Sequence, residues 1–76
     1  MTNTELQAKK SRYGKALKRR RKELKKAKNY FISRGLSITQ MTSIEENKTS
    51  YTFESVLRYI EALGLELELR EKGKFD

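Results

Sequence analysis

Apolar positions in the first third of the chain recur with the period of a helix. One stripe of a 3.6-residue repeat is formed by Leu6, Tyr13, Leu17 and Leu24, with Ala16 and Ala27 beside it. The other faces of this segment are almost wholly Lys and Arg. We expect residues 1–3 to be frayed and Thr4 to be the N-cap, because Glu5 then lies in the first turn, where a carboxylate suits the helix dipole.

Neither proline nor glycine marks the end of this helix before Gly35. We place the boundary at the Lys25-Lys26 pair, with a second helix after it. That second helix contains Tyr30-Phe31-Ile32, the densest apolar cluster in the chain. Such a cluster is far more typical of core packing than of an aromatic platform for stacked bases.

Residues 35–48 have the pattern of a short helix with a polar outer face. Ser37 and Gln40 have the spacing of a capping box, and Asn47 suits the left-handed position that ends a helix. Met41 and Ile44 are predicted to face the core. The outer arc is then uncharged and rich in hydrogen-bonding groups, and it consists of Thr39, Gln40, Thr42 and Ser43. Exposed helix faces usually carry Lys and Glu, so this face is predicted to meet a ligand.

A fourth helix is predicted after a polar loop at residues 49–51. Thr52 is its expected N-cap, Glu54 suits its first turn, and Gly64 is its expected end. Its predicted core stripe is Phe53, Val56, Leu57, Ile60 and Leu63.

After Gly64 the period changes from that of a helix to that of a strand. Leucines at positions 65, 67 and 69 alternate with charged residues through Arg70. A lone strand leaves its backbone groups unpaired, and the economical partner is the same segment of a second subunit. We therefore predict dimerisation through Leu65, Leu67 and Leu69. Residues 72–76 are expected to form a disordered tail.

Composition narrows the class of protein. A chain of 76 residues with 36% apolar residues supports only a marginal core, which favours oligomerisation. The chain lacks cysteine and histidine, so it offers no disulfide, no thiolate nucleophile and no imidazole base or ligand. We expect no enzyme activity, no catalytic residues, no metal and no cofactor. No apolar run approaches the roughly 20 residues that span a bilayer, so we expect a cytoplasmic protein.

The net charge of +8 is concentrated in one half of the chain. Residues 9–34 hold thirteen Lys or Arg against one acid, Glu23, a net +12, whereas residues 35–76 hold five against eight, a net −3. Charge runs are usually solvated helix faces. Here the run K-R-R-R-K at residues 18–22 has no acid within it. A field of this kind attracts polyanions, and nucleic acid is the favoured one.

Several segments resemble the Xre/Cro-type helix-turn-helix family, and the closest likeness is to its small HipB-like members. The resemblance covers residues 13–70 and rests on Y-G-K-A-L-K at 13–18, G-L-S at 35–37, S-I-E-E-N-K at 43–48 and L-R-Y-I-E-A-L-G-L at 57–65. It implies a mainly α domain of four to five helices with a C-terminal β-strand that pairs across a homodimer. The expected layout is a basic helical extension at 1–12, the DNA-binding domain at 13–64, a dimerisation strand at 65–71 and a tail at 72–76.

In that family the helix after the turn enters the DNA major groove. The resemblance therefore implies base readout by Ile38, Thr39, Gln40, Thr42 and Ser43. Candidate phosphate contacts are Arg20, Arg21, Lys22, Lys25, Lys26, Lys28, Ser37 and Lys48. Two departures stand out: lysines replace the usual T-Q pair at the start of the second helix, and Ile38 stands where a polar contact is common. Ile38 is expected either to touch a thymine methyl or to pack against the protein.

The expected function is sequence-specific binding of double-stranded DNA by a homodimer that represses transcription at a pseudo-palindromic operator. HipB-like proteins are commonly antitoxins that repress their own operon, so the resemblance also allows a toxin partner. The main alternative is a small basic RNA-binding or ribosome-associated protein. A basic amphipathic helix lying on an anionic membrane ranks last, because its apolar stripe is narrow.

Overall fold

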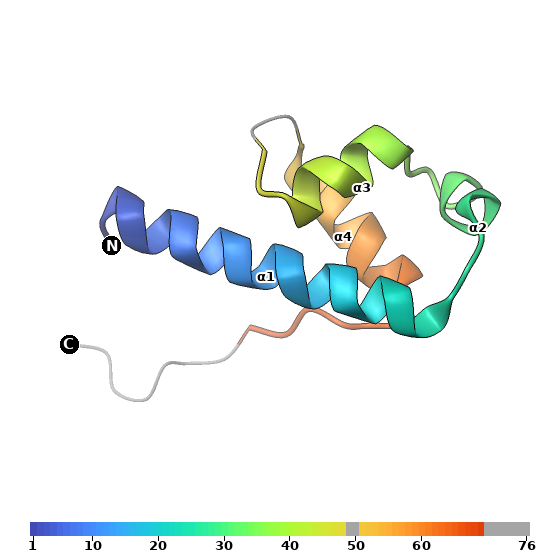
Figure 1. Ribbon diagram of the computed structural model, residues 1–76, viewed down its shortest axis with the longest axis horizontal. Helices are drawn as coiled ribbons and strands as arrows, with labels where there is room; N and C mark the ends of the chain where they lie inside the picture. The colour runs from blue at the N-terminus through green and yellow to red at the C-terminus, as the bar shows by residue number, and fades with distance from the viewer. Residues whose placement is uncertain (49–50, 70–76) are drawn as a thin grey trace.

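The computed structural model describes residues 1–48 and 51–69, which form four helices and contain no strand. The helices are α1 (Asn3–Leu24), α2 (Lys28–Ile32), α3 (Ile38–Glu45) and α4 (Phe53–Ala62). Helix α1 forms the long side of the molecule, with α3 and α4 packed over its second half (Figure 1). Helix α2 lies beyond its C-terminal end, and the first turns of α1 extend past the other helices (Figure 1). The described chain is thus mainly helical, as expected.

Helix α1 begins earlier than predicted. The hydroxyl of Thr2, rather than that of Thr4, accepts the backbone N–H of Glu5 at 3.1 Å, so the helix begins at Asn3 and the expected Thr4 cap is wrong. Its predicted end is confirmed. Lys25 adopts a left-handed conformation with φ of 53°, and its N–H donates to the Arg21 carbonyl. The chain then re-enters a helix at Lys28.

The predicted ends of α3 are confirmed. The Ser37 hydroxyl accepts the Gln40 N–H at 3.0 Å, and the Gln40 side chain accepts the Ser37 N–H at 2.9 Å, which completes the capping box. Gly35, with φ of 82°, forms the turn between α2 and α3, and Asn47, with φ of 56°, ends α3. These local signals fix the start and length of α3 before any tertiary contact is considered.

Helix α4 has the predicted ends but a different buried face. Thr52 caps it in a capping box with Ser55, and Gly64 follows with φ of 71°. Its buried residues are Ser55, Tyr59 and Ala62, followed by Leu63. The predicted stripe is confirmed at Leu63, and Val56 and Ile60 are half-buried and pack against the core. It is wrong at Phe53, which is 68% exposed, and at Leu57, which is also exposed.

The core lies where the second half of α1 meets α2, α3 and α4. Its buried apolar residues are Leu17, Phe31, Leu36, Met41, Ile44, Tyr59, Ala62 and Leu63. The predicted core positions Met41 and Ile44 are confirmed. Of the apolar stripe of α1, Leu17 is buried and Leu24 half-buried, whereas Leu6, Tyr13, Ala16 and Ala27 are exposed. The cluster at residues 30–32 is core only at Phe31 and partly at Tyr30, since Ile32 is exposed.

Gly14 allows α1 and α3 to pack closely. A Cβ atom at this position would lie 2.6 Å from the Glu45 carbonyl oxygen and 2.7 Å from that of Ile44. Real Cβ contacts are essentially never shorter than 3.0 Å, and the obstructing atoms are backbone. The close approach of the two helices therefore depends on this glycine.

Residues 65–69 follow α4 without helix or strand pairing. The Nε of Arg20 donates to the Leu63 carbonyl at 3.1 Å, which ties the start of this segment to α1. Within the described residues of a single chain, the predicted strand is therefore not formed. The strand pairing that we expected is with a second subunit, so it stays a prediction. Arg70, the tail at 72–76 and residues 49 and 50 of the predicted loop lie outside the described residues.

Candidate nucleic-acid interface

A depression of about 160 Å³ brings the start of α2 together with the outer face of α3. Three candidate phosphate contacts, Arg21, Lys26 and Lys28, and two candidate readout residues, Ile38 and Thr42, line it together. The remaining lining residues are Phe31, Met41 and Glu45. Residues from separate parts of the sequence are therefore combined into one surface that is basic at its rim and apolar at its floor.

The outer arc of α3 is narrower than predicted. Ile38 and Thr39 are exposed and Thr42 is half-buried. Ser43 is only 3% exposed, so its prediction as an outward residue is wrong. Helix α3 packs against both α1 and α4, so more of its circumference is buried than a one-sided amphipathic helix would bury.

Gln40 occupies the edge of this arc. Its side-chain oxygen is engaged by the Ser37 N–H, and the residue lines a small depression with Gly35, Thr52, Glu54, Ser55 and Arg58. The half-buried Gln40 side chain thus serves the capping box and lies toward the first turn of α4.

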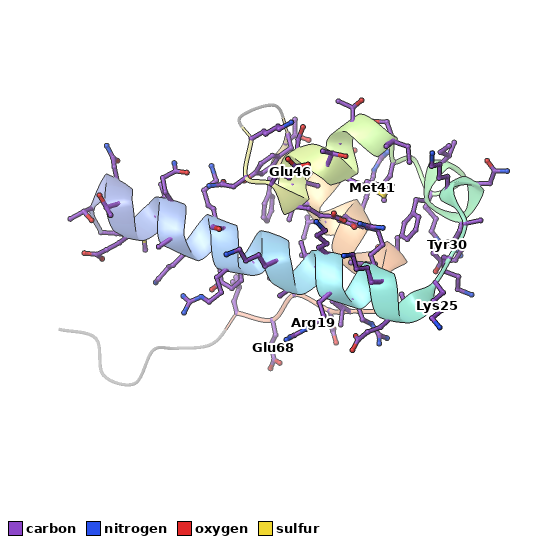
Figure 2. All side chains as sticks on the ribbon, in the orientation of Figure 1. Arg19, Lys25, Tyr30, Met41, Glu46 and Glu68 are labelled. Carbon is purple, nitrogen blue, oxygen red and sulfur yellow. The ribbon has the colours of Figure 1, made fainter. Side chains whose placement is uncertain are left out.

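Glu46 shares the outer arc and was missed in the sequence. It lies four residues after Thr42 and seven after Thr39, so the three residues follow one face. Its carboxylate is exposed at the C-terminal end of α3 (Figure 2), 3.9 Å from the Lys48 ammonium. The seven-residue spacing from Thr39 was the available signal. A carboxylate here can accept a hydrogen bond from cytosine N4 or repel a phosphate.

The candidate phosphate contacts divide into two groups. Lys22, Lys25, Lys26 and Lys28 are exposed around the junction of α1 and α2, where Figure 2 labels Lys25. The others have hydrogen-bond or ion-pair partners within the chain. Arg20 holds the Leu63 carbonyl and lies 3.9 Å from Glu23, the Ser37 hydroxyl caps α3, and Lys48 lies beside Glu46.

Arg21 belongs to an internal network rather than to the open surface. Its Nε and one terminal nitrogen donate to the two oxygens of Glu45 at 2.6 and 3.1 Å. The Tyr59 hydroxyl donates to the same carboxylate. Because the Glu45 side chain is only 6% exposed, these donors replace water around a buried charge. The network joins α1, α3 and α4 through one residue near the end of α3.

The network also shifts proton affinities. The hydrogen bond to Glu45 raises the pKa of the Arg21 guanidinium. Burial raises the pKa of the Tyr59 hydroxyl well above its ordinary value, and the hydrogen bond to Glu45 raises it further. Arg21 therefore stays charged and Tyr59 stays neutral at physiological pH. The sequence held one signal for this network: Arg21 falls between Leu17 and Leu24 on the stripe of α1, where an apolar residue is expected.

Comparisons of the chain with protein-family models, with curated proteins and with solved structures find no match. Within residues 1–48 and 51–69, no helix has both the length and the hydropathy that crossing a bilayer requires.

Proposed function

We propose that the protein binds double-stranded DNA sequence-specifically and represses transcription as a homodimer on a pseudo-palindromic operator. Helices α2 and α3, with the turn between them, act as the helix-turn-helix unit, and α3 enters the major groove. The observation that carries the proposal is the shared surface on which Lys26 and Lys28 flank Ile38 and Thr42. Base edges and backbone phosphates lie side by side in a duplex. A protein that recognises a DNA sequence therefore needs cationic groups next to the groups that contact the bases.

The proposed readout set follows from exposure. Ile38, Thr39 and Thr42 face outward on α3, and Glu46 extends their row. The exposed lysines at positions 22, 25, 26 and 28 hold the phosphates. Arg21 acts differently, because its guanidinium fixes Glu45 and hence the end of α3. The resemblance to HipB-like proteins extends the proposal to an antitoxin that represses its own operon and binds a toxin partner.

Selection of bound DNA from a random duplex pool, at a stated salt concentration, tests the proposal. A symmetric consensus and a log–log salt slope of about −0.9 per neutralised phosphate are expected. A-form RNA duplexes of matched length serve as the control, because their major groove is too deep and narrow to admit a helix. Equal affinity for RNA and DNA with no enriched sequence would refute the proposal and favour a general RNA-binding protein.

A further inference from the structure

The apolar stripe of α1 continues beyond the core of its own chain. Leu17 is buried and Leu24 half-buried, whereas Leu6 is 44% and Tyr13 62% exposed. A spacing of seven residues places Leu6, Tyr13 and Arg20 on one face of the helix. The first turns of α1 extend past the other helices (Figure 1), so within residues 1–48 and 51–69 no helix covers this end of the stripe.

A second apolar surface lies between α4 and the segment that follows it. Leu57, Ile60, Leu65 and Leu67 line a groove of about 450 Å³ together with Glu61 and Glu66. The three leucines are exposed, and Ile60 is half-buried. Scattered exposed apolar residues are ordinary, but three exposed leucines and Ile60 that line one groove are typical of a surface that binds another chain.

The two surfaces lie on the same side of the molecule. Arg20 shares the face of Tyr13 on α1, and its guanidinium holds the Leu63 carbonyl, from which residues 65–69 continue. In the view of Figure 1, that segment then runs back in the direction of the first half of α1. The uncovered stripe and the groove are therefore both available to one partner that approaches from this side.

The charges beside the two surfaces are complementary. Lys9 lies between Leu6 and Tyr13 on the stripe face, at three and four residues from them. Glu61 and Glu66 stand on the walls of the groove. A basic apolar helix therefore matches an acidic apolar groove, and both are present on the same chain. In a twofold dimer such a contact forms twice, because the surface of each copy meets the reciprocal surface of the other.

We propose that the first half of α1 from one copy docks into the groove of a second copy. The contact places Leu6 and Tyr13 against Leu57 and Leu67 of the other copy and Lys9 beside Glu61. This inference rests on the dimer of the proposed function and assigns its contacts: α1 contributes to association, in addition to residues 65–69.

Sedimentation of Tyr13→Lys at a series of concentrations tests the contact. Loss of a buried aromatic contact should raise the dimer dissociation constant by at least about tenfold. The helical circular dichroism should not change, because Tyr13 is exposed in the single chain. Lys15→Glu is the matched control, since Lys15 is exposed on the opposite side of α1 and should leave association unchanged.

A charge exchange tests the register. Lys9→Glu and Glu61→Lys should each weaken the dimer, and the double variant should recover most of the loss. A double variant as weak as the single variants would overturn the assigned contact. A wild type that is monomeric throughout would remove the proposed dimer itself. A stable wild-type dimer in which Tyr13→Lys associates as well as Lys15→Glu would overturn only the role of α1.

Discussion

Replacing Arg21 by Met should destabilise the fold strongly while leaving its apolar contacts largely in place. The change removes both guanidinium donors from Glu45 and keeps a side chain of similar length. Glu45 then stays buried with the Tyr59 hydroxyl as its remaining donor in the network. Breaking a buried ion pair from one side costs about 3–5 kcal/mol. Since the Arg21 side chain is 32% exposed, we expect a loss of about 2–4 kcal/mol.

That loss is large for this protein. A chain of 76 residues is typically stable by roughly 4–11 kcal/mol, so a loss of about 2–4 kcal/mol is a large fraction of its free energy of unfolding. Urea denaturation followed by circular dichroism gives the free energy of unfolding and its slope with denaturant. Arg19→Met is the matched control on the same helix, because Arg19 is exposed; a change within about 0.5 kcal/mol is expected there.

A third variant separates the buried charge from other effects of the substitution. Arg21→Met combined with Glu45→Leu and Tyr59→Phe removes every polar side chain of the network at once. Replacing a buried polar group and its partners together is often nearly neutral, so this variant should be more stable than Arg21→Met alone. If Arg21→Met were as stable as Arg19→Met, the buried carboxylate would not depend on Arg21 and the reasoning would be refuted.

Four further outcomes are expected. The double variant Lys26→Gln and Lys28→Gln should weaken binding to operator and to random DNA alike and lower the salt slope of binding by about 2, as measured by fluorescence anisotropy. An unchanged slope would show that these lysines do not contact phosphates. Thr42→Val should reduce the ratio of operator to random affinity, measured by the same assay, and leave random binding intact. Gly14→Ala should cost about 1–3 kcal/mol in urea denaturation, because its Cβ meets the Glu45 carbonyl, although alanine favours helices. The free energy of unfolding should fall as pH rises above 10.0, because the raised pKa of Tyr59 makes the folded chain keep a proton that the unfolded chain releases. Thermal denaturation at several pH values should show a smaller decrease for Tyr59→Phe.

Helix ends were predictable wherever the deciding residues are close in sequence. The capping box of Ser37 and Gln40 and the left-handed Asn47 depend on groups within a few residues, and their geometry is as expected. The start of α1 was missed because Thr2 and Thr4 are chemically equivalent as caps, and either places Glu5 in the first turn. Local chemistry then leaves the choice open.

Buried faces were harder to predict, because they depend on neighbours distant in the sequence. Apolar spacing in α4 favoured the side of Leu57, yet the helix buries the side of Tyr59, whose hydroxyl reaches Glu45. Ser43 is buried because α3 is enclosed from two directions. The apolar pattern of one segment does not show which other segment will pack against it. The partners of the Arg21–Glu45 ion pair, for example, are twenty-four residues apart in the sequence.

Two sides of helix α4 make different contacts, and this arrangement links the proposed DNA binding thermodynamically to the proposed association of two copies. One side carries Tyr59, which is bonded to Glu45 at the end of α3. The other carries Leu57 and Ile60, which line the groove. If a second copy in that groove stabilises one orientation of α4, the Tyr59–Glu45 hydrogen bond also favours one orientation of α3. Linkage is reciprocal, so an operator that prefers this orientation would tighten association of the two copies by the factor by which association tightens operator binding.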